Sequence, residues 1–346
     1  MKDHIISASA SVRDALDAID RLSGKALILF ATDSDGRVCG ALTGGDIRRA
    51  LLRGVTLGDP VTQAMNANFL AITEDCDPYE AVAIGKKKRL KLVPITRDGH
   101  LIDILDLDTL QALLPLDVVL MAGGKGERLR PLTLETPKPL LEVAGRPIID
   151  RNIELLETFG INHVFVTVNY LHEKIEDHFA ARNATAARAK VECVLEPKRL
   201  GTLGSLALIP SFTHEDVLVM NSDLLTSIDF EKMLLHHKRT GAALTVGAVP
   251  YTVSVPYAIM RSEGSRVTGL EEKPTFNYFA NGGVYIIRTE LVELIPQGKF
   301  LDAPDFIEQL IAHGKRVELF PIEGRWIDIG NPDDYRAANK LLANEH

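Results

Sequence analysis

The 346-residue sequence has few of the residues that define specialised folds, with three cysteines, one tryptophan and 6% aromatic residues. The cysteines (Cys39, Cys76 and Cys193) are scattered and odd in number, so they indicate neither a disulfide framework nor a zinc site. No apolar run reaches the roughly 18 residues that a membrane-spanning helix needs, and no signal-peptide core stands at the start. We therefore expect a cytoplasmic protein with no membrane partner.

Basic residues are fewer than acidic residues, with 39 lysines and arginines against 47 aspartates and glutamates. The net charge is −8, which argues against nucleic acid as the main partner. Hydrophobic residues make up 46% of the chain and charged residues 25%, as in an ordinary globular protein. A chain of this length is enough for roughly two or three domains.

A glycine-rich stretch is the most informative part of the sequence. The apolar run 118–122 is typical of a strand that is buried on both faces. Gly123, Gly124 and Gly126 follow it directly. Glycines after a parallel strand let backbone N–H groups close on phosphate oxygens, because no Cβ stands in the way. This pattern predicts a phosphate-binding loop.

Two basic residues follow the glycines. Arg128 offers a planar fork of donors, and Lys138 offers a compact charge between two prolines. The dinucleotide fingerprint fails because Leu129 stands at its third glycine position, and no Gly-Lys-Ser/Thr follows to complete a Walker loop. The stretch predicts a polyphosphate site of another kind.

Downstream, apolar runs alternate with helical patterns, which favours an α/β fold with a mostly parallel sheet and helices on both faces. The predicted strands are residues 163–168, 191–195, 217–220, 244–249 and 317–320, and the predicted helices are residues 148–159, 172–181, 230–239 and 303–312. Ligands of such sheets collect at the carboxyl ends of the strands.

Three polar segments stand at those strand ends. Residues 196–204, which contain Glu196, Gly201 and Thr202, follow a strand and open a helix whose free N–H groups could face an anion or a base. Asp223 ends the strongest apolar strand, and Asp328 follows the last one. Taken singly, an aspartate after a strand is more often a turn former or a helix cap.

Together, Gly-Gly-x-Gly-x-Arg-Leu, Pro-Lys-Pro-Leu and these strand-end residues resemble the motifs of the sugar-1-phosphate nucleotidyltransferases. The resemblance runs from Asp117 to about Tyr335 and implies a Rossmann-like domain. It implies that Arg128 and Lys138 bind the triphosphate and assist catalysis. It further implies that Asp223 and Asp328 hold Mg²⁺. The implied nucleotide-binding residues are Ala122, Gly123, Gly124, Gly126, Glu196, Gly201 and Thr202.

The sugar side of the site is also implied by resemblance. Glu272 and Lys273 match a Glu-Lys-Pro motif that binds sugar hydroxyls and the sugar phosphate, and Asn281 and Gly282 match a segment lining the sugar pocket. Leu203 replaces a usual alanine, which we expect to narrow the space beside the base or ribose.

Glu196 bears on the choice of base. Relatives that use UTP or dTTP often have glutamine here, whereas a carboxylate can accept both donors of the Watson–Crick edge of guanine. This predicts GTP as the nucleotide. The alternative is that Glu196 caps the helix near Gly201 and the base is read by backbone.

The domain order resembles the glucosamine-1-phosphate guanylyltransferases of legionaminic acid synthesis. The predicted sugar is therefore glucosamine-1-phosphate, although mannose-1-phosphate guanylyltransferases share every motif, and a UTP- or dTTP-using hexose-1-phosphate enzyme is a further alternative. A rival from another class is an inactive regulatory or scaffold subunit. Retention of the basic and acidic motif residues together argues against that rival.

The first 112 residues contain a repeat of about 60 residues, a length typical of stacked modules. It resembles a tandem pair of CBS domains (residues 1–112), followed by the transferase domain (residues 117–346). In that family a Thr-x-x-Asp holds an adenosine ribose, and Thr43 and Asp46 match it. The second copy has Asp106 and Thr109 instead, so the pair binds one adenine nucleotide or serves only in assembly. We expect a homo-oligomer.

Overall fold

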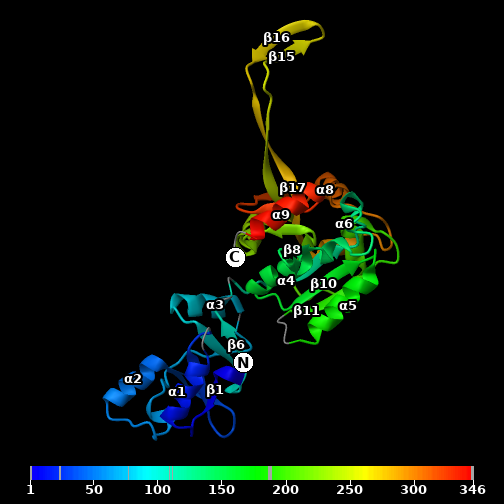
Figure 1. The fold of residues 1–346 in the computed structure, drawn as a ribbon. Coiled ribbons are helices and arrows are strands. Elements are labelled where there is room, and N and C mark those ends of the chain that lie inside the picture. Colours follow the sequence, from blue (N-terminus) through cyan, green and yellow to red (C-terminus); the bar gives the residue numbers. More distant parts are fainter. Residues whose placement is uncertain are drawn as a thin grey trace. The chain divides into compact units, whose positions relative to one another are not determined.

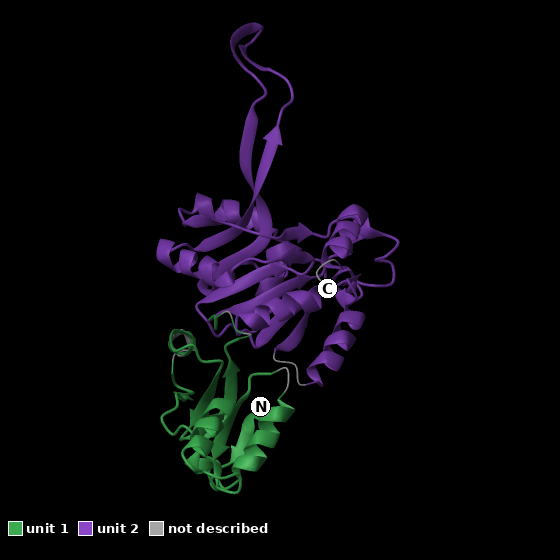
Figure 2. Cartoon of the chain, turned by 60° about the vertical axis from the view of Figure 1, so that its left-hand side comes forward, with its two compact units in different colours: residues 1–114 green, residues 115–346 purple. Residues whose placement is uncertain are grey.

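The computed structural model describes residues 2–22, 25–76, 78–108, 110, 112–185 and 189–343. The chain divides into two compact units, residues 1–114 and residues 115–346 (Figure 2). Among the helices of the described residues, none combines the length and the apolar character needed to cross a membrane.

Unit 1 contains two three-stranded sheets built alike. In the first, β1 (Ile5–Ser7) is parallel to β2 (Ile28–Thr32), which is antiparallel to β3 (Val38–Thr43). The second sheet, of β4 (Ile72–Thr73), β5 (Leu92–Arg97) and β6 (His100–Asp106), repeats both relations. The helices of this unit are α1 (Val12–Arg21), α2 (Gly44–Leu52) and α3 (Pro78–Lys87), with 3-10 turns η1 (Lys2–His4) and η2 (Val61–Gln63).

The repeat is incomplete at its end. In the first copy β3 runs into α2, whereas after β6 Leu107 and Asp108 form a turn, and Leu110 and residues 112–116 are irregular. Leu110, Leu114 and Leu116 are nevertheless buried. Thr109 and Gln111 lie outside the described residues.

Unit 2 is built around a seven-stranded sheet in the order β11-β10-β7-β12-β17-β14-β18. Its strands are β7 (Asp117–Ala122), β10 (His163–Val168), β11 (Lys190–Leu195), β12 (Asp216–Asn221), β14 (Leu244–Ser254), β17 (Thr275–Arg288) and β18 (Val317–Pro321). Only β17 runs antiparallel to its neighbours. The predicted mixed, mostly parallel α/β sheet is confirmed.

The helices of unit 2 are α4 (Ile148–Thr158), α5 (His172–Asn183), α6 (Gly201–Gly204), α7 (Phe230–Thr240), α8 (Ala303–Ala312) and α9 (Pro332–Ala343). The four helices predicted at residues 148, 172, 230 and 303 begin at those residues, and α9 was not predicted. The shorter elements are η3 (Glu127–Leu129), η4 (Lys138–Leu140), β8 (Glu142–Val143), β9 (Arg146–Pro147), η5 (Ser205–Leu208), β13 (Leu224–Thr226), β15 (Ile259–Glu263), β16 (Arg266–Glu271), η6 (Thr289–Leu294) and β19 (Trp326–Asp328).

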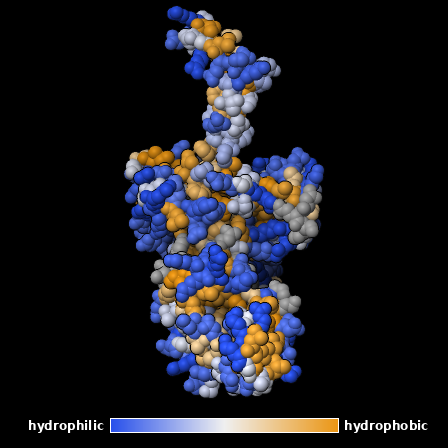
Figure 3. Space-filling model, turned by 90° about the vertical axis from the view of Figure 1, so that its left-hand side faces the viewer, coloured by the Kyte–Doolittle hydropathy of each residue, from blue (hydrophilic) through white to orange (hydrophobic). Residues whose placement is uncertain are grey.

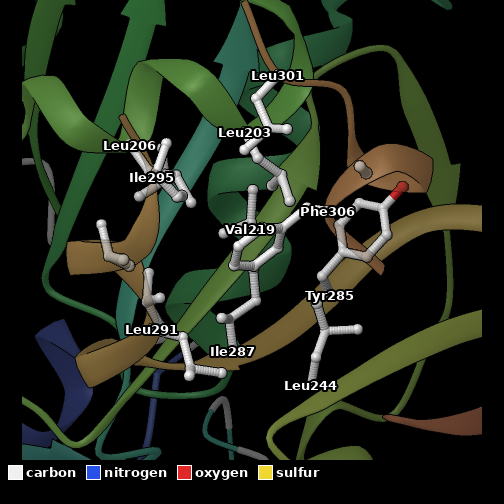
Figure 4. Packing of buried hydrophobic residues seen from close by; sticks show 14 of the residues in the cluster. Leu203, Leu206, Val219, Leu244, Tyr285, Ile287, Leu291, Ile295, Leu301 and Phe306 are labelled. Atoms are coloured by element: carbon white, nitrogen blue, oxygen red, sulfur yellow. The ribbon is translucent and has the colours of Figure 1, made fainter. Parts of the chain in front are cut away.

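Both faces of the sheet are buried. On one face, Val219 and Ile287 pack in a cluster with Leu203 and Phe306 from α6 and α8 (Figure 4). Their strand neighbours point to the opposite face, and Leu218 there has no exposed surface either. Leu203 is fully buried in this core, so our expectation that it narrows the nucleotide space is wrong.

The strands β14 and β17 leave the sheet as a long ribbon (Figure 1). The predicted strand 244–249 was too short, because β14 continues to Ser254 and pairs with β17 as far as Thr275. A register shift after Gly247 and the left-handed backbone of Gly283 (φ +69°) mark where the ribbon departs. The two-stranded sheet of β15 and β16 forms its outer end.

Candidate functional site

The glycine loop lies at the carboxyl edge of the sheet, because β7 stands between the parallel strands β10 and β12. Gly126 adopts φ +60°, and a Cβ there would stand 2.9 Å from the Thr133 side chain. The Thr133 hydroxyl donates to the Gly126 carbonyl at 2.8 Å and holds the turn. A Cβ added at Gly124 meets nothing within 4 Å, so the loop is open on that side.

Lys138 reaches the two predicted metal-binding aspartates. Its ammonium pairs with Asp223 Oδ2 and lies 3.8 Å from Asp328 Oδ1. The Lys138 side chain is only 11% exposed, so this charge is held in place between the carboxylates. Opposite charges at such distances in a partly buried site interact more strongly than at the open surface.

Strand pairing brings the two aspartates together. Asp328 in β19 is the register partner of Leu224 in β13, the residue after Asp223, and the Ile329 N–H donates to the Asp223 carbonyl at 3.2 Å. Burial raises the pKa of Asp328, and the negative charge of Asp223 raises it further. The nearby Lys138 and Arg128 charges act in the opposite direction.

Arg128 completes the group of basic residues. A Cβ added at Gly330 would stand 3.0 Å from Nη2 of Arg128, so the guanidinium lies against the backbone just after Asp328. Gly330 therefore leaves room for this side chain. The structure brings together Arg128, Lys138, Asp223 and Asp328, as the sequence predicted.

The carboxylate pair suits a divalent metal ion. Asp223 Oδ1 is buried and has no hydrogen-bond partner within the protein. Over the described residues, no group of three or more histidine, cysteine, aspartate or glutamate side chains is placed to hold a metal. A pair of carboxylates is nevertheless sufficient for Mg²⁺, which usually completes its shell with water and substrate phosphates.

Glu196 is buried beside the glycine loop. It is 4% exposed, its Oε2 accepts from the Leu200 N–H at 3.1 Å, and burial raises its pKa. A Cβ at Gly123 would stand 2.6 Å from Glu196 Oε1, so Gly123 is needed for this close approach. The alternative was that Glu196 caps the helix near Gly201; its bond goes to the N–H of Leu200, just before α6, and base reading by Glu196 stays a prediction.

Three N–H groups of α6 are already bonded within the protein. The Thr202 N–H and hydroxyl both donate to Asp302 Oδ1, and the N–H groups of Leu203 and Gly204 donate to the Leu301 carbonyl. The expectation of a free N–H group is therefore wrong for Thr202, whereas nucleotide binding by Gly201 and Thr202 stays a prediction. The sequence could not reveal this, because Asp302 arrives from a distant segment.

The predicted sugar-binding residues divide into two places. Asn281 and Gly282 stand at the root of the ribbon, where the Trp326 indole N–H donates to the Gly282 carbonyl at 2.8 Å. Glu272 and Lys273 lie beyond Thr275 at the outer part of the ribbon. The strand from Thr275 to Asn281 spans roughly 20 Å at about 3.3 Å per residue, so a single chain does not bring Lys273 to Asp223.

The structure also reveals supporting residues that the sequence analysis did not select. Asn152 donates to the Ser222 carbonyl at 3.1 Å, and the Ser222 hydroxyl donates to the Met121 carbonyl at 2.6 Å. Asn169 at the end of β10 donates to the Glu196 carbonyl at 2.9 Å. The position of Ser222 and Asn169 just after strands could have marked them in the sequence. Their hydrogen-bond partners could not be predicted, because those partners come from other segments of the fold.

Comparison with known proteins identifies the family. Residues 117–345 match the family model described as nucleotidyl transferase. The chain belongs to the nucleotidyl transferase family. The predicted resemblance is thereby confirmed, and this nucleotidyl transferase domain accounts for nearly all of unit 2.

Its relatives include several guanylyltransferases. Mannose-1-phosphate guanylyltransferase 1 of Arabidopsis thaliana is 32% identical over 65% of this chain and 64% of that protein. D-glycero-alpha-D-manno-heptose 1-phosphate guanylyltransferase of Aneurinibacillus thermoaerophilus is 32% identical over 66% of this chain and 98% of that protein. The chain matches between 62% and 65% of the length of the mannose-1-phosphate guanylyltransferases among these relatives.

Solved structures agree with this family. The crystal structure of HddC from Yersinia pseudotuberculosis is 26% identical to this chain with a TM-score of 0.52, over 66% of this chain and 99% of that one. The same protein in complex with GMP-PN gives a TM-score of 0.51 and the same identity.

At the other end of the chain, Thr43 and Asp46 form a local cap. The Thr43 hydroxyl accepts from the Asp46 N–H, while the Asp46 carboxylate accepts from Thr43 and from Arg49. Ser11 and Asp14 make the same capping box at α1, so the pattern by itself needs no ligand. Residues 1–53 of this nucleotidyl transferase match the CBS domain model.

Proposed function

We propose that this protein transfers a guanylyl group from GTP to a sugar-1-phosphate, forming a GDP-sugar and pyrophosphate. The observation that carries the proposal is the convergence of Arg128, Lys138, Asp223 and Asp328 beside the glycine loop. The guanylyltransferase names of the relatives and the GMP-PN complex of HddC support GTP as the nucleotide.

In the proposed reaction, an oxygen of the sugar phosphate attacks the α-phosphorus of GTP. A new O–P bond forms as the bond between the α-phosphorus and the oxygen of the leaving group breaks, and pyrophosphate departs. Such transfers depend on positioning and charge stabilisation rather than covalent catalysis by the protein. Gly123, Gly124 and Gly126 with Ala122 would hold the phosphates, and Arg128 and Lys138 would offset their charge.

Asp223 and Asp328 are the proposed ligands of Mg²⁺. When bound, the ion neutralises charge on the phosphates and helps to orient them. The partnerless Asp223 Oδ1 favours this assignment.

We assign sugar-phosphate binding to Glu272, Lys273, Asn281 and Gly282. The predicted sugar is glucosamine-1-phosphate, as in legionaminic acid synthesis. Mannose-1-phosphate is the alternative that the Arabidopsis relative favours, and a heptose-1-phosphate is the one that the Aneurinibacillus relative favours.

Pyrophosphate release tests the proposal. Purified protein with Mg²⁺ is assayed with GTP, UTP, dTTP and ATP, each combined with a panel of glucosamine-, mannose-, heptose- and glucose-1-phosphates. We expect turnover with GTP and one of these sugars above all other pairs. Absence of release with every pair would overturn the proposal and favour the inactive scaffold.

We further propose that residues 1–112 form a tandem CBS module ahead of the transferase domain (residues 117–346), with one adenine-nucleotide site at Thr43 and Asp46. Calorimetry with AMP, ADP and ATP is expected to show one site per chain, which Asp46→Ala abolishes. Asp14→Ala is the matched control, because it removes the same kind of helix cap and leaves Asp46 intact. No heat with any of the three nucleotides would leave the pair as an assembly module.

A further inference from the structure

The ribbon of β14 and β17 has an apolar face that nothing in the described chain covers. We name residues 250–281 the arm. Ten of the twenty-three exposed large hydrophobic residues of the described chain lie on it: Tyr251, Val253, Tyr257, Ile259, Met260, Val267, Leu270, Phe276, Tyr278 and Phe279. Figure 3 shows hydrophobic residues at the surface of its outer end.

The arm is amphipathic across its two strands. Tyr251 is the register partner of Tyr278, and Val253 that of Phe276. Directly opposed residues of two strands share a face, so these four side chains form one apolar surface, where the Phe276 and Tyr278 rings stack with centroids 6.4 Å apart. Tyr251 is 59% exposed and Tyr278 is 55% exposed.

The other face of the ribbon is polar from Thr252 to Ser254 and from Thr275 to Asn277, and Pro250 and Phe279 lie on it nearer the root. The Thr252 hydroxyl donates to Asn277 Oδ1 at 3.0 Å, and the Ser254 and Thr275 hydroxyls lie 3.3 Å apart. Residues 251–254 and 275–278 alternate between apolar and polar, which is typical of a strand pair with one buried face. Because an isolated two-stranded ribbon is only marginally stable in water, the apolar face requires a covering surface.

The charge and size of the arm favour a second copy of this chain as that surface. The arm carries three basic and three acidic residues, so no excess charge of one sign attracts nucleic acid or an anionic membrane. The arm has 32 residues, enough to supply the roughly 20–30 residues that each side contributes to a stable interface. In a contact about a two-fold axis, the apolar face of one arm packs against the same apolar face of the other arm.

The root of the arm adjoins the candidate site. Trp326 of β19 donates to the Gly282 carbonyl, and Asp328 ends the same strand. A Cβ at Gly283 would stand 2.6 Å from Asn221 Nδ2, next to the segment that carries Asp223. If two arms pack antiparallel about a two-fold axis, the outer part of one arm lies at the root of the other.

We propose that two copies dock through their arms, apolar face to apolar face, and that each arm delivers Lys273 to the phosphate site of the other copy. The inference rests on the proposed function for the role of Lys273. It explains how Lys273 reaches a site that its own chain keeps at least roughly 20 Å away along the strand.

Co-expression of two differently tagged variants tests the exchange. Asp223→Asn and Lys273→Ala are each expected to be nearly inactive alone. In the purified mixed dimer, one of two sites has both Asp223 and Lys273 intact, so turnover should return to roughly half that of the wild type. No recovery, or a Lys273→Ala protein that is fully active alone, would overturn the proposal. The experiment is repeated with Arg128→Ala in place of Asp223→Asn. The same recovery is expected, so that a folding defect of the Asp223→Asn protein alone cannot decide the result.

Tyr278→Glu and Asn277→Glu form a matched pair on opposite faces of the arm. The wild type and Asn277→Glu should sediment at twice the 38.0 kDa chain mass, whereas Tyr278→Glu should sediment as a monomer. A monomeric wild type, or a dimeric Tyr278→Glu, would rule out arm docking. This readout needs no turnover, so it still decides the docking if the wild type releases no pyrophosphate and the proposed function fails.

Discussion

Replacing either Asp223 or Asp328 by asparagine is expected to lower turnover by about two to three orders of magnitude, the usual scale for losing a group that stabilises transition-state charge. Asparagine keeps the size of the side chain but removes the negative charge that a magnesium ion requires. The two side chains lie on adjoining strands and share contact with Lys138. We therefore expect either substitution to weaken the binding of the same magnesium ion.

Steady-state turnover and Mg²⁺ titration by calorimetry check this expectation. Circular dichroism should show an unchanged fold, since the pairing of β13 with β19 uses backbone groups. Asp229→Asn is the control, because Asp229 caps α7 through the Lys232 N–H and has no place in the site. Near-normal turnover in either variant would remove that residue from the metal site.

The wild-type enzyme is expected to prefer GTP to UTP and dTTP, and Glu196→Gln should erode that preference by roughly 5- to 150-fold, equivalent to about 1–3 kcal/mol. The N1–H and exocyclic amine of guanine are adjacent donors that a carboxylate accepts in parallel, and such charge-assisted bonds are stronger than neutral ones. Glu196 Oε2 already accepts from the Leu200 N–H, but each carboxylate oxygen has a second lone pair.

The ratio of kcat/KM for GTP to that for UTP measures the effect. A glutamine at position 196 can still accept from the Leu200 N–H through its carbonyl, so the loop should keep its shape. Glu192→Gln, in the strand β11 that ends just before Glu196, changes a side chain that is 46% exposed and should leave the ratio unchanged. If Glu196→Gln also leaves it unchanged, the residue only holds the loop, and a wild type that is faster with UTP or dTTP would contradict the base assignment.

Local pattern was enough to predict much of unit 2. The apolar run 118–122 became β7, and helices α4, α5, α7 and α8 begin where helical spacing begins. These features depend on side-chain periodicity over a few residues, which any chain segment displays in its own sequence. The phosphate loop with its glycines at 123, 124 and 126 and the later Lys138 could be predicted in the same way. Such a loop needs particular residue types within a short stretch of sequence.

Contacts between residues of distant segments could not be predicted from local pattern. Asp302 takes the N–H of Thr202, and Leu203 turns into the core rather than toward the nucleotide. The strand that carries Asn281 continues outward as an arm, which separates Lys273 from Asp223. The sequence by itself thus determined the elements and the chemistry of the phosphate loop. Only the tertiary structure decided which distant residues meet, because strand pairing and packing depend on the whole fold rather than on local periodicity.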